Sequence, residues 1–169
     1  MNQEAATTAP AFITPDALMY MWNGHRGLTR RVIDAFPEDK LFNYQIGGMR
    51  TFADMARELM ALAANGVEGM VTGQFKGIEE LDYHNGDQKA TTKEALLKQW
   101  DESTERMNKA WEQMPAERFT EMVNGFNQYN MPGFGFILYL IDNENHHRGE
   151  GYVYLRSLGI EPPPFWDRF

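Results

Sequence analysis

The sequence predicts an all-α protein built as a four-helix bundle. Three observations predict this class. Apolar residues recur at spacings of three and four along four long segments, which is the period of a helix that is buried on one face. Each of these segments begins at a residue type that favours a helix start. No segment has the alternating pattern that is typical of a half-buried strand.

The first helix is predicted over residues 15–36. Thr14 followed by Pro15 is typical of a helix start, because threonine caps the first turn and proline fits its first position. The apolar pattern then continues until Pro37, which ends it. Residues 37–50 contain proline, asparagine and two adjacent glycines, so they are predicted to form a connecting loop.

The second and third helices also have recognisable starts. Thr51 is followed three positions later by an acidic residue, which indicates a capped helix that continues to about residue 74. The polar segment 77–90 is predicted to be a connection. A second capping pattern at residues 91–94 then opens the third helix, which ends near Pro115.

The fourth helix follows a loop that is rich in asparagine, glycine and aromatic residues, at 115–131. Pro132 can start this helix, and Gly159 lies just beyond its end. The tail at 162–166 contains three consecutive prolines, so it cannot continue as a helix. We expect the tail to pack back on the bundle as an extended strap.

Composition limits the classes of partner and compartment. Residues 14–169 are expected to form one domain, preceded by a disordered lead-in at 1–13. The net charge of −8 argues against a nucleic-acid partner, and no apolar run approaches the roughly 20 residues of a membrane span. The chain has no cysteine, and its first residues do not resemble a signal peptide, so a cytoplasmic location is expected.

The fourth helix carries a polar interruption in its core-facing stripe. Counting by threes and fours places six residues on that stripe, namely Phe136, Leu140, Asn143, His147, Glu150 and Tyr154. Polar groups inside such a stripe must be hydrogen-bonded, paired or metal-bound, because burying them without partners costs several kcal/mol, roughly 2–7 each. His146 is about 100° away from His147 on a helix, so one of the two is expected to be solvated.

Glu58 on the second helix has two interpretations. It can form a surface pair with Arg57, or it can face Asn143 and His147 across the bundle. In the second case the three side chains can hold a divalent ion or form a metal-free hydrogen-bond network. His25 and His84 have no partners at ligand spacing and are expected to be solvated. No nucleotide-binding motif is present, so no nucleotide cofactor is expected.

Several segments resemble one known family. The run His146-His147-Arg148-Gly149-Glu150, with Tyr154-Leu155-Arg156, Gly159 and Pro162-Pro163 beyond it, resembles the C-terminal helix of the DinB-like superfamily, also called YfiT-like metal-dependent hydrolases. The segment 49–58 is similar to the capped start of a second family helix. The resemblance extends over about residues 15–165. This family is unrelated to the DNA polymerase that shares the DinB name.

The resemblance implies a four-helix bundle that binds one divalent metal, often Zn²⁺ or Ni²⁺, through three histidines. Those positions are Glu58, Asn143 and His147 here, so only His147 keeps the ligand type of the family. Glutamate still suits Zn²⁺, Mn²⁺ or Fe²⁺, whereas asparagine is a poor ligand for transition metals. Glu150 replaces the glutamine of the family motif, and it can bind metal or orient the imidazole. Whether the site holds one transition-metal ion or none is left open.

Two functions are compatible with these observations. The first, implied by the resemblance, is a metal-dependent thiol transferase or isomerase acting on a small molecule or thiol, with His147 as a ligand and Glu58 as a ligand or general base. The second is a metal-free ligand-binding or stress-response module that acts as a homodimer. For that dimer we expect exposed aromatic residues in the segment 124–139, namely Phe126, Tyr129 and Phe134. Catalytic residues are not assigned from the sequence.

Overall fold

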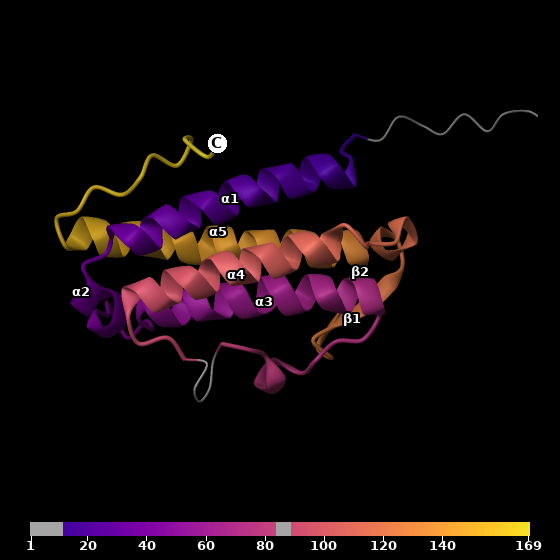
Figure 1. Cartoon of the computed structure of the whole chain (residues 1–169), viewed down its shortest axis with the longest axis horizontal. Coiled ribbons are helices and arrows are strands. Elements are labelled where there is room, and N and C mark those ends of the chain that lie inside the picture. The colour runs from indigo at the N-terminus through magenta and orange to yellow at the C-terminus, as the bar shows by residue number, and fades with distance from the viewer. Residues whose placement is uncertain (1–11, 84–88) are drawn as a thin grey trace, which may run out of the picture.

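The computed structural model describes residues 12–83 and 89–169. In this part of the chain four long helices lie side by side (Figure 1): α1 (Pro15–Ala35), α3 (Phe52–Thr72), α4 (Lys93–Trp111) and α5 (Gly133–Ser157). The predicted four-helix bundle is therefore confirmed. The lead-in predicted at 1–13 falls outside the described residues except for its last two, and His84 also lies outside them.

The predicted caps set the starts of three helices. The hydroxyl oxygens of Thr14, Thr51 and Thr92 each accept a hydrogen bond from the backbone N–H three residues later. These bonds satisfy amides that have no partner within the first turn. At the other end of α3, Gly73 takes a left-handed conformation with φ of 74°, which closes that helix.

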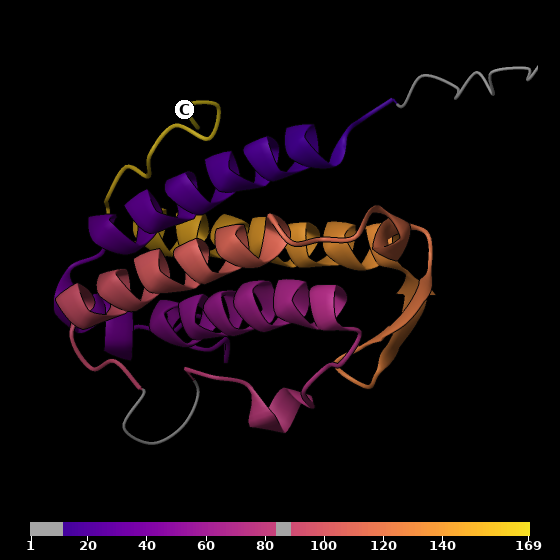
Figure 2. The ribbon, with the colours of Figure 1, turned by 45° about the vertical axis from the view of Figure 1, so that its right-hand side comes forward.

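The order of the helices explains the long connection between α3 and α4. The helices α1 and α5 run in one direction and α3 and α4 in the other, as Figures 1 and 2 show from two sides. Both α1 and α3 pack against α4 and α5. Because α3 and α4 are parallel, the chain must return along the bundle between them, and the described residues 73–83 and 89–92 belong to this crossover.

Two predicted loops contain short elements that the sequence did not indicate. The loop at 37–50 includes α2 (Glu38–Asn43), and the loop at 115–131 includes a hairpin of β1 (Met122–Gly125) and β2 (Tyr129–Pro132). Among the described residues, the 3-10 turn η1 (Ile78–Glu80) lies between α3 and α4, and the 3-10 turn η3 (Ala116–Phe119) lies just before the hairpin in the loop at 115–131. The sequence showed no strand pattern because strands of four residues are too short for a clear alternation. The hairpin corrects that prediction and leaves the four-helix bundle unchanged.

The hairpin changes the exposure that we expected for its aromatic residues. Phe126 is only 1 % exposed, because its ring packs against Phe75 and Phe136. Tyr129 is half-buried, and Phe134 is 51 % exposed. The turn residues Phe126 and Asn127 have positive φ angles of 51° and 59°, so this turn has the backbone of a tight hairpin. The expected exposure is therefore wrong for Phe126 and correct for Phe134.

The C-terminal strap is present as expected. Residues 159–169 leave α5 and run back along α1 (Figure 1). Arg31 donates a hydrogen bond of 3.0 Å to the Asp167 carboxylate, and the Phe169 ring stacks on Tyr20 with centroids 4.4 Å apart. Gly24 has no side chain beneath that ring, where a β-carbon would lie 2.7 Å from Phe169.

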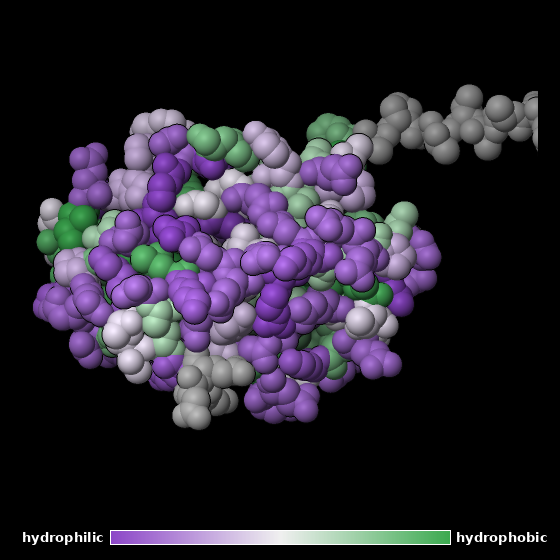
Figure 3. All heavy atoms as spheres, viewed as in Figure 1, coloured by the Kyte–Doolittle hydropathy of each residue, from purple (hydrophilic) through white to green (hydrophobic). Residues whose placement is uncertain are grey.

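The surface in view is mostly hydrophilic (Figure 3). Figure 3 shows hydrophilic residues over most of one face of the molecule, with hydrophobic residues in small separate groups. Among the described residues, none of the helices combines the length and the apolar character that a membrane crossing requires.

Candidate functional site

The close approach of α3 and α5 brings the predicted site residues together. Gly151 makes this approach possible, because a β-carbon there would lie 2.4 Å from the Phe52 ring. The Tyr154 hydroxyl donates a hydrogen bond of 2.8 Å to the backbone oxygen of Arg50, which ties the start of α3 to α5. Glu58 on α3 and His147 on α5 consequently face each other in the middle of the bundle.

His147 lies between two carboxylates. Its Nε2 atom is 3.2 Å from Glu58 Oε1, and its Nδ1 atom is 2.6 Å from Glu150 Oε2. The Asn143 amide donates a further hydrogen bond of 3.2 Å to Glu58 Oε1. The structure thus brings together the three positions that the family resemblance pointed to and adds Glu150. We call Glu58, His147 and Glu150 the carboxylate–histidine site.

The surface pair considered for Arg57 and Glu58 does not form. The Arg57 side chain is buried and donates hydrogen bonds of 2.5 Å to the backbone oxygen of Ala90 and to the Asp54 carboxylate. Adjacent helix residues point about 100° apart, so Arg57 and Glu58 face different neighbours. Of the two interpretations, the structure has the one in which Glu58 faces α5.

Arg50 is a site residue that sequence reasoning missed. Its Nη1 atom lies 2.5 Å from Glu58 Oε2, the carboxylate oxygen that His147 does not use. Arg50 precedes the cap residue Thr51, and its side chain must reach over two turns of α3 to make this contact. Sequence spacing does not define the path of a residue outside the helix, so the sequence carries no direct signal for this pair.

These contacts shift both key pKa values. Burial alone would raise the pKa of Glu58, but hydrogen bonds from His147, Arg50 and Asn143 outweigh it and bring the pKa to about 2. Burial alone would lower the pKa of His147, yet hydrogen bonds to Glu58 and Glu150 raise it above its ordinary value. Without a metal, these contacts therefore favour the protonated form of the His147 imidazole.

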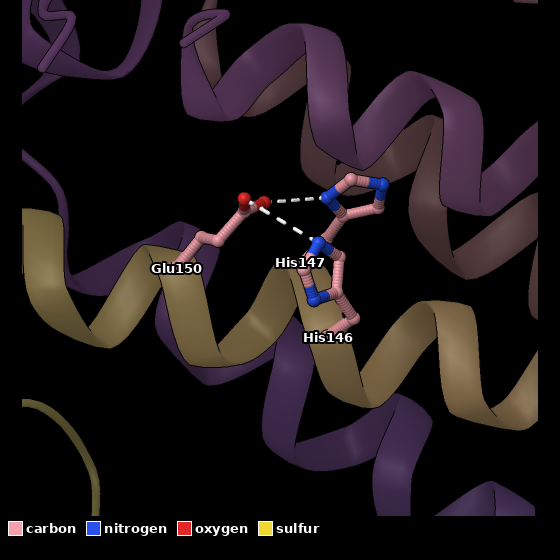
Figure 4. Close-up of side chains that lie close together, drawn as sticks. All are labelled: His146, His147 and Glu150. Atoms are coloured by element: carbon pink, nitrogen blue, oxygen red, sulfur yellow. Dashed lines mark hydrogen bonds and ion pairs between the residues drawn. The ribbon is translucent and has the colours of Figure 1, made fainter. Parts of the chain in front are cut away.

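The neighbouring His146 is the solvated member of the histidine pair. Its side chain is 67 % exposed, whereas His147 is buried. Its Nε2 atom nevertheless lies 3.5 Å from Glu150 Oε1, and Figure 4 shows Glu150 in contact with both histidines. One donor atom from each of His146, His147 and Glu150 falls within a group 4.8 Å across, which is compact enough for one metal ion.

The donor atoms fit a divalent ion in two ways. On the Glu58 side, the 3.2 Å between His147 Nε2 and Glu58 Oε1 is the separation of two ligands that each lie about 2.1 Å from one ion. In the second arrangement, the ion would lie on the Glu150 side, with Glu150, His147 Nδ1 and His146 as its ligands. The first arrangement leaves Nδ1–H to donate to Glu150, which is the usual orienting contact for a metal-bound histidine. Asn143 presents its NH₂ group to Glu58 and is not positioned as a ligand.

A second polar cluster lies on a neighbouring face of α5, toward α1, and sequence reasoning missed it. Glu144 is buried and accepts hydrogen bonds from Trp22 Nε1 at 3.1 Å and from the Thr29 hydroxyl at 2.7 Å. Arg26, also buried, lies 3.6 Å from the same carboxylate and stacks on the Trp100 ring. This carboxylate links α1 to α5 inside the core.

His25 belongs to this second cluster, and its expected solvation is wrong. Its Nδ1 atom lies 3.1 Å from Arg148 Nη2, and its Nε2 atom lies 3.3 Å from Arg168 Nη1. Burial and then the charges of Arg148 and Arg168 lower the pKa of His25 to about 4. We call His25, Arg148 and Arg168 the guanidinium–histidine cluster. The strap supplies Arg168, a partner that local spacing around His25 cannot reveal.

Comparisons with known proteins agree with the fold. The model of the DinB family matches residues 1–168. A DinB-like protein from Bacillus cereus ATCC 10987 superposes with a TM-score of 0.67 at 20 % identity, covering 88 % of this chain and 95 % of that one. A DinB-like protein from Bacillus subtilis, YjoA, superposes with a TM-score of 0.73 at 14 % identity, covering 90 % and 99 %. No curated protein gives a significant match.

Proposed function

Because the chain belongs to the DinB family, we propose that it is a divalent-metal-dependent enzyme that acts on a small thiol or carbonyl substrate, as a thiol transferase or isomerase. One observation carries the proposal. His147 Nε2 and Glu58 Oε1 are spaced as two ligands of one ion, while Glu150 holds the other imidazole nitrogen at 2.6 Å. The ion would be Zn²⁺, Ni²⁺, Mn²⁺ or Fe²⁺, which accept nitrogen and carboxylate ligands.

Each side chain of the site has a separate part in this proposal. Glu150 fixes the imidazole so that Nε2 points toward Glu58. Asn143 and Arg50 hold the Glu58 carboxylate in place, and Arg50 offsets part of its charge. A bound ion would supply a Lewis acid that lowers the pKa of a thiol or polarises a carbonyl. Two protein ligands leave open positions, which such a substrate requires.

The proton on His147 competes with the metal. In the metal-free state that proton lies between Nε2 and Glu58, where the ion would bind. Metal affinity should therefore fall about tenfold for each unit by which the pH drops below the raised pKa of His147. Isothermal titration with Zn²⁺ at several pH values measures this slope. An affinity that does not change with pH would contradict binding at His147.

Elemental analysis tests the proposal directly. Untagged protein prepared without chelators should carry close to one equivalent of a transition metal by plasma mass spectrometry. His147→Ala should abolish the metal and the transfer of small thiols to an electrophilic acceptor, followed by absorbance. Glu102→Gln, an exposed carboxylate on α4, is the matched control and should change neither.

Two further variants separate the two ligand arrangements. Glu58→Gln should abolish binding if the ion lies on the Nε2 side, whereas His146→Ala should abolish it if the ion lies on the Nδ1 side. Wild-type protein that contains no metal, and that shows no thermal shift when metals are added, would rule out the metal-dependent enzyme.

A second function is favoured by a specific observation. Arg50 and Asn143 already give Glu58 a cation and a hydrogen-bond donor, so the site is satisfied without an ion. The alternative proposal is a metal-free ligand-binding or stress-response module that acts as a homodimer. Phe134 and Leu138, exposed one turn apart on α5, would then contribute to the dimer contact. Light scattering that gives a monomeric mass would exclude this dimer.

A further inference from the structure

A cavity lies on the side of α5 that faces away from the carboxylate–histidine site. It encloses about 380 Å³ between α5 and the C-terminal strap. From α5, Arg148, Tyr152 and Arg156 line it, and from the strap the residues of segment 161–166 do so. The volume is within the range of small-molecule sites, roughly 300–1,000 Å³. Nothing in the proposed metal chemistry uses this cavity.

The Tyr152 hydroxyl is the first indication of a ligand. Its oxygen is buried, and among the described residues it has no hydrogen-bond partner. A buried hydroxyl without a partner is unfavourable, because it loses its bonds to water and gains none in return. Tyr152 also lines the cavity, and a shift of its side chain toward the cavity lets a polar group placed there receive its hydrogen bond.

The positive charge around Tyr152 is the second indication. Burial raises the pKa of Tyr152, and four guanidinium groups act in the opposite direction, those of Arg148, Arg31, Arg156 and Arg168. The Arg156 guanidinium lies 5.7 Å from the centre of the Tyr152 ring. In a chain of net charge −8, this local excess of arginine favours an anion.

Some of these guanidinium donors are already used by the protein, and others are not. Arg148 donates to Asn145 at 2.7 Å and to His25 Nδ1 at 3.1 Å. A neutral imidazole accepts at one nitrogen only, so His25 Nε2 then carries hydrogen and cannot accept from Arg168. Arg156 is exposed at the edge of the cavity. Arg168 does not line the cavity, and the donors of Arg148 are already used, so Arg156 and Tyr152 are the donors best placed for a ligand.

The strap supplies the apolar side of the cavity. Pro163, Pro164 and Phe165 line it, and Trp166, which is 73 % exposed, completes the rim. Glu161 adds one negative charge to the lining. This charge disfavours a dianion such as phosphate and leaves the balance suited to a single negative charge.

We propose that this cavity binds a small organic carboxylate with an apolar body. The carboxylate accepts hydrogen bonds from the Tyr152 hydroxyl and the Arg156 guanidinium, whose planar donor groups match its two oxygens. The body of the ligand packs on the prolines and aromatic rings of the strap. The site is independent of the metal site, since its residues point from the opposite side of α5.

Amide NMR titration of the ¹⁵N-labelled full chain with phenylacetate tests the proposal. The Gly149 amide, in the wall of the cavity, should shift on titration together with the Trp166 indole N–H. Tyr152→Phe removes only the hydroxyl and should weaken binding at least about tenfold. Arg156→Gln should weaken it by a similar factor. Arg30→Gln, a half-exposed arginine paired with Asp101, and His147→Ala should both bind as the wild type does.

Neutral and dianionic probes complete the test. Phenylacetamide has the shape of phenylacetate without its charge, so it should produce no shift at Gly149. Inorganic phosphate should bind more weakly than phenylacetate. Three results would each overturn the proposal: no shift at Gly149 up to the solubility limit of phenylacetate, equal binding of phenylacetamide or phosphate, or unchanged affinity in Tyr152→Phe.

Discussion

Two histidines of this bundle occupy opposite electrostatic environments. In the carboxylate–histidine site, His147 lies between Glu58 and Glu150, and its pKa is raised. In the guanidinium–histidine cluster, His25 lies between Arg148 and Arg168, and burial together with these two charges lowers its pKa to about 4. Both side chains are buried in one small domain. Burial lowers the pKa of both imidazoles, and the charge of the partners decides whether this effect is reversed, as at His147, or reinforced, as at His25.

Among the variants that test this comparison, Glu144→Ala is expected to change the free energy of unfolding most. The Glu144 carboxylate is the buried negative charge nearest to Arg26, and it also opposes the charge of Arg148. Its removal leaves buried guanidinium charge uncompensated, so we expect the free energy of unfolding to fall by about 3–5 kcal/mol. Urea denaturation measures the loss. Glu102→Ala, on the exposed face of α4, should change stability by no more than about 0.5 kcal/mol. A similar small change in Glu144→Ala would show that the cluster is not held by this carboxylate.

A smaller effect is expected from His25 in acid. Its folded pKa of about 4 lies below the ordinary value of 6.5, so the unfolded chain binds more protons between these values. The contribution of His25 to stability is therefore complete above pH 6.5 and is lost as the pH falls toward 4. His25→Gln should reduce the acid-side loss of stability by about 1–2 kcal/mol, measured by urea denaturation at a series of pH values. An unchanged acid profile would mean that the pKa of His25 is not lowered in the folded protein.

The sequence predicted the carboxylate–histidine site better than the guanidinium–histidine cluster. Counting along one stripe of α5 identified Asn143, His147 and Glu150, and the family resemblance pointed to Glu58. A second stripe, with the same spacing, is also buried, and it consists of Ile137, Ile141, Glu144, Arg148, Gly151 and Leu155. Counting along this stripe would have identified the buried Glu144 and Arg148, which is a signal that the sequence does contain.

Other parts of the structure have no such signal. The contact between Arg50 and Glu58 and the contact between Arg168 and His25 both depend on the paths of non-helical segments. Those paths are set by tertiary packing, as in the bond from Tyr154 to the backbone of Arg50. The caps at Thr14, Thr51 and Thr92 are local, and for this reason the helix starts were predictable to within about two residues.

His147 should respond to pH in the opposite direction from His25. Its folded pKa is raised, so its contribution to stability is complete below pH 6.5 and is lost as the pH rises through the raised value. His147→Gln should remove this alkaline loss in metal-free protein. Denaturation in the presence of a chelator isolates the effect from metal binding. If wild type and variant lost stability equally above pH 6.5, the protonated form of His147 would be refuted.

The smallest effect is expected from Arg50→Gln. Arg50 is half-exposed, so its pair with Glu58 should contribute no more than about 1 kcal/mol to stability at neutral pH. The pKa of Glu58 is the more sensitive measurement, because Arg50 is one of three groups that hold it at about 2. Titration of the Glu58 side-chain carboxyl carbon by NMR should show this pKa rising toward 4.5, with Arg30→Gln as the control that leaves it unchanged. A pKa that stayed at about 2 would assign the whole shift to His147 and Asn143. The proton of His147 would then be the only positive charge that a metal must replace at this site.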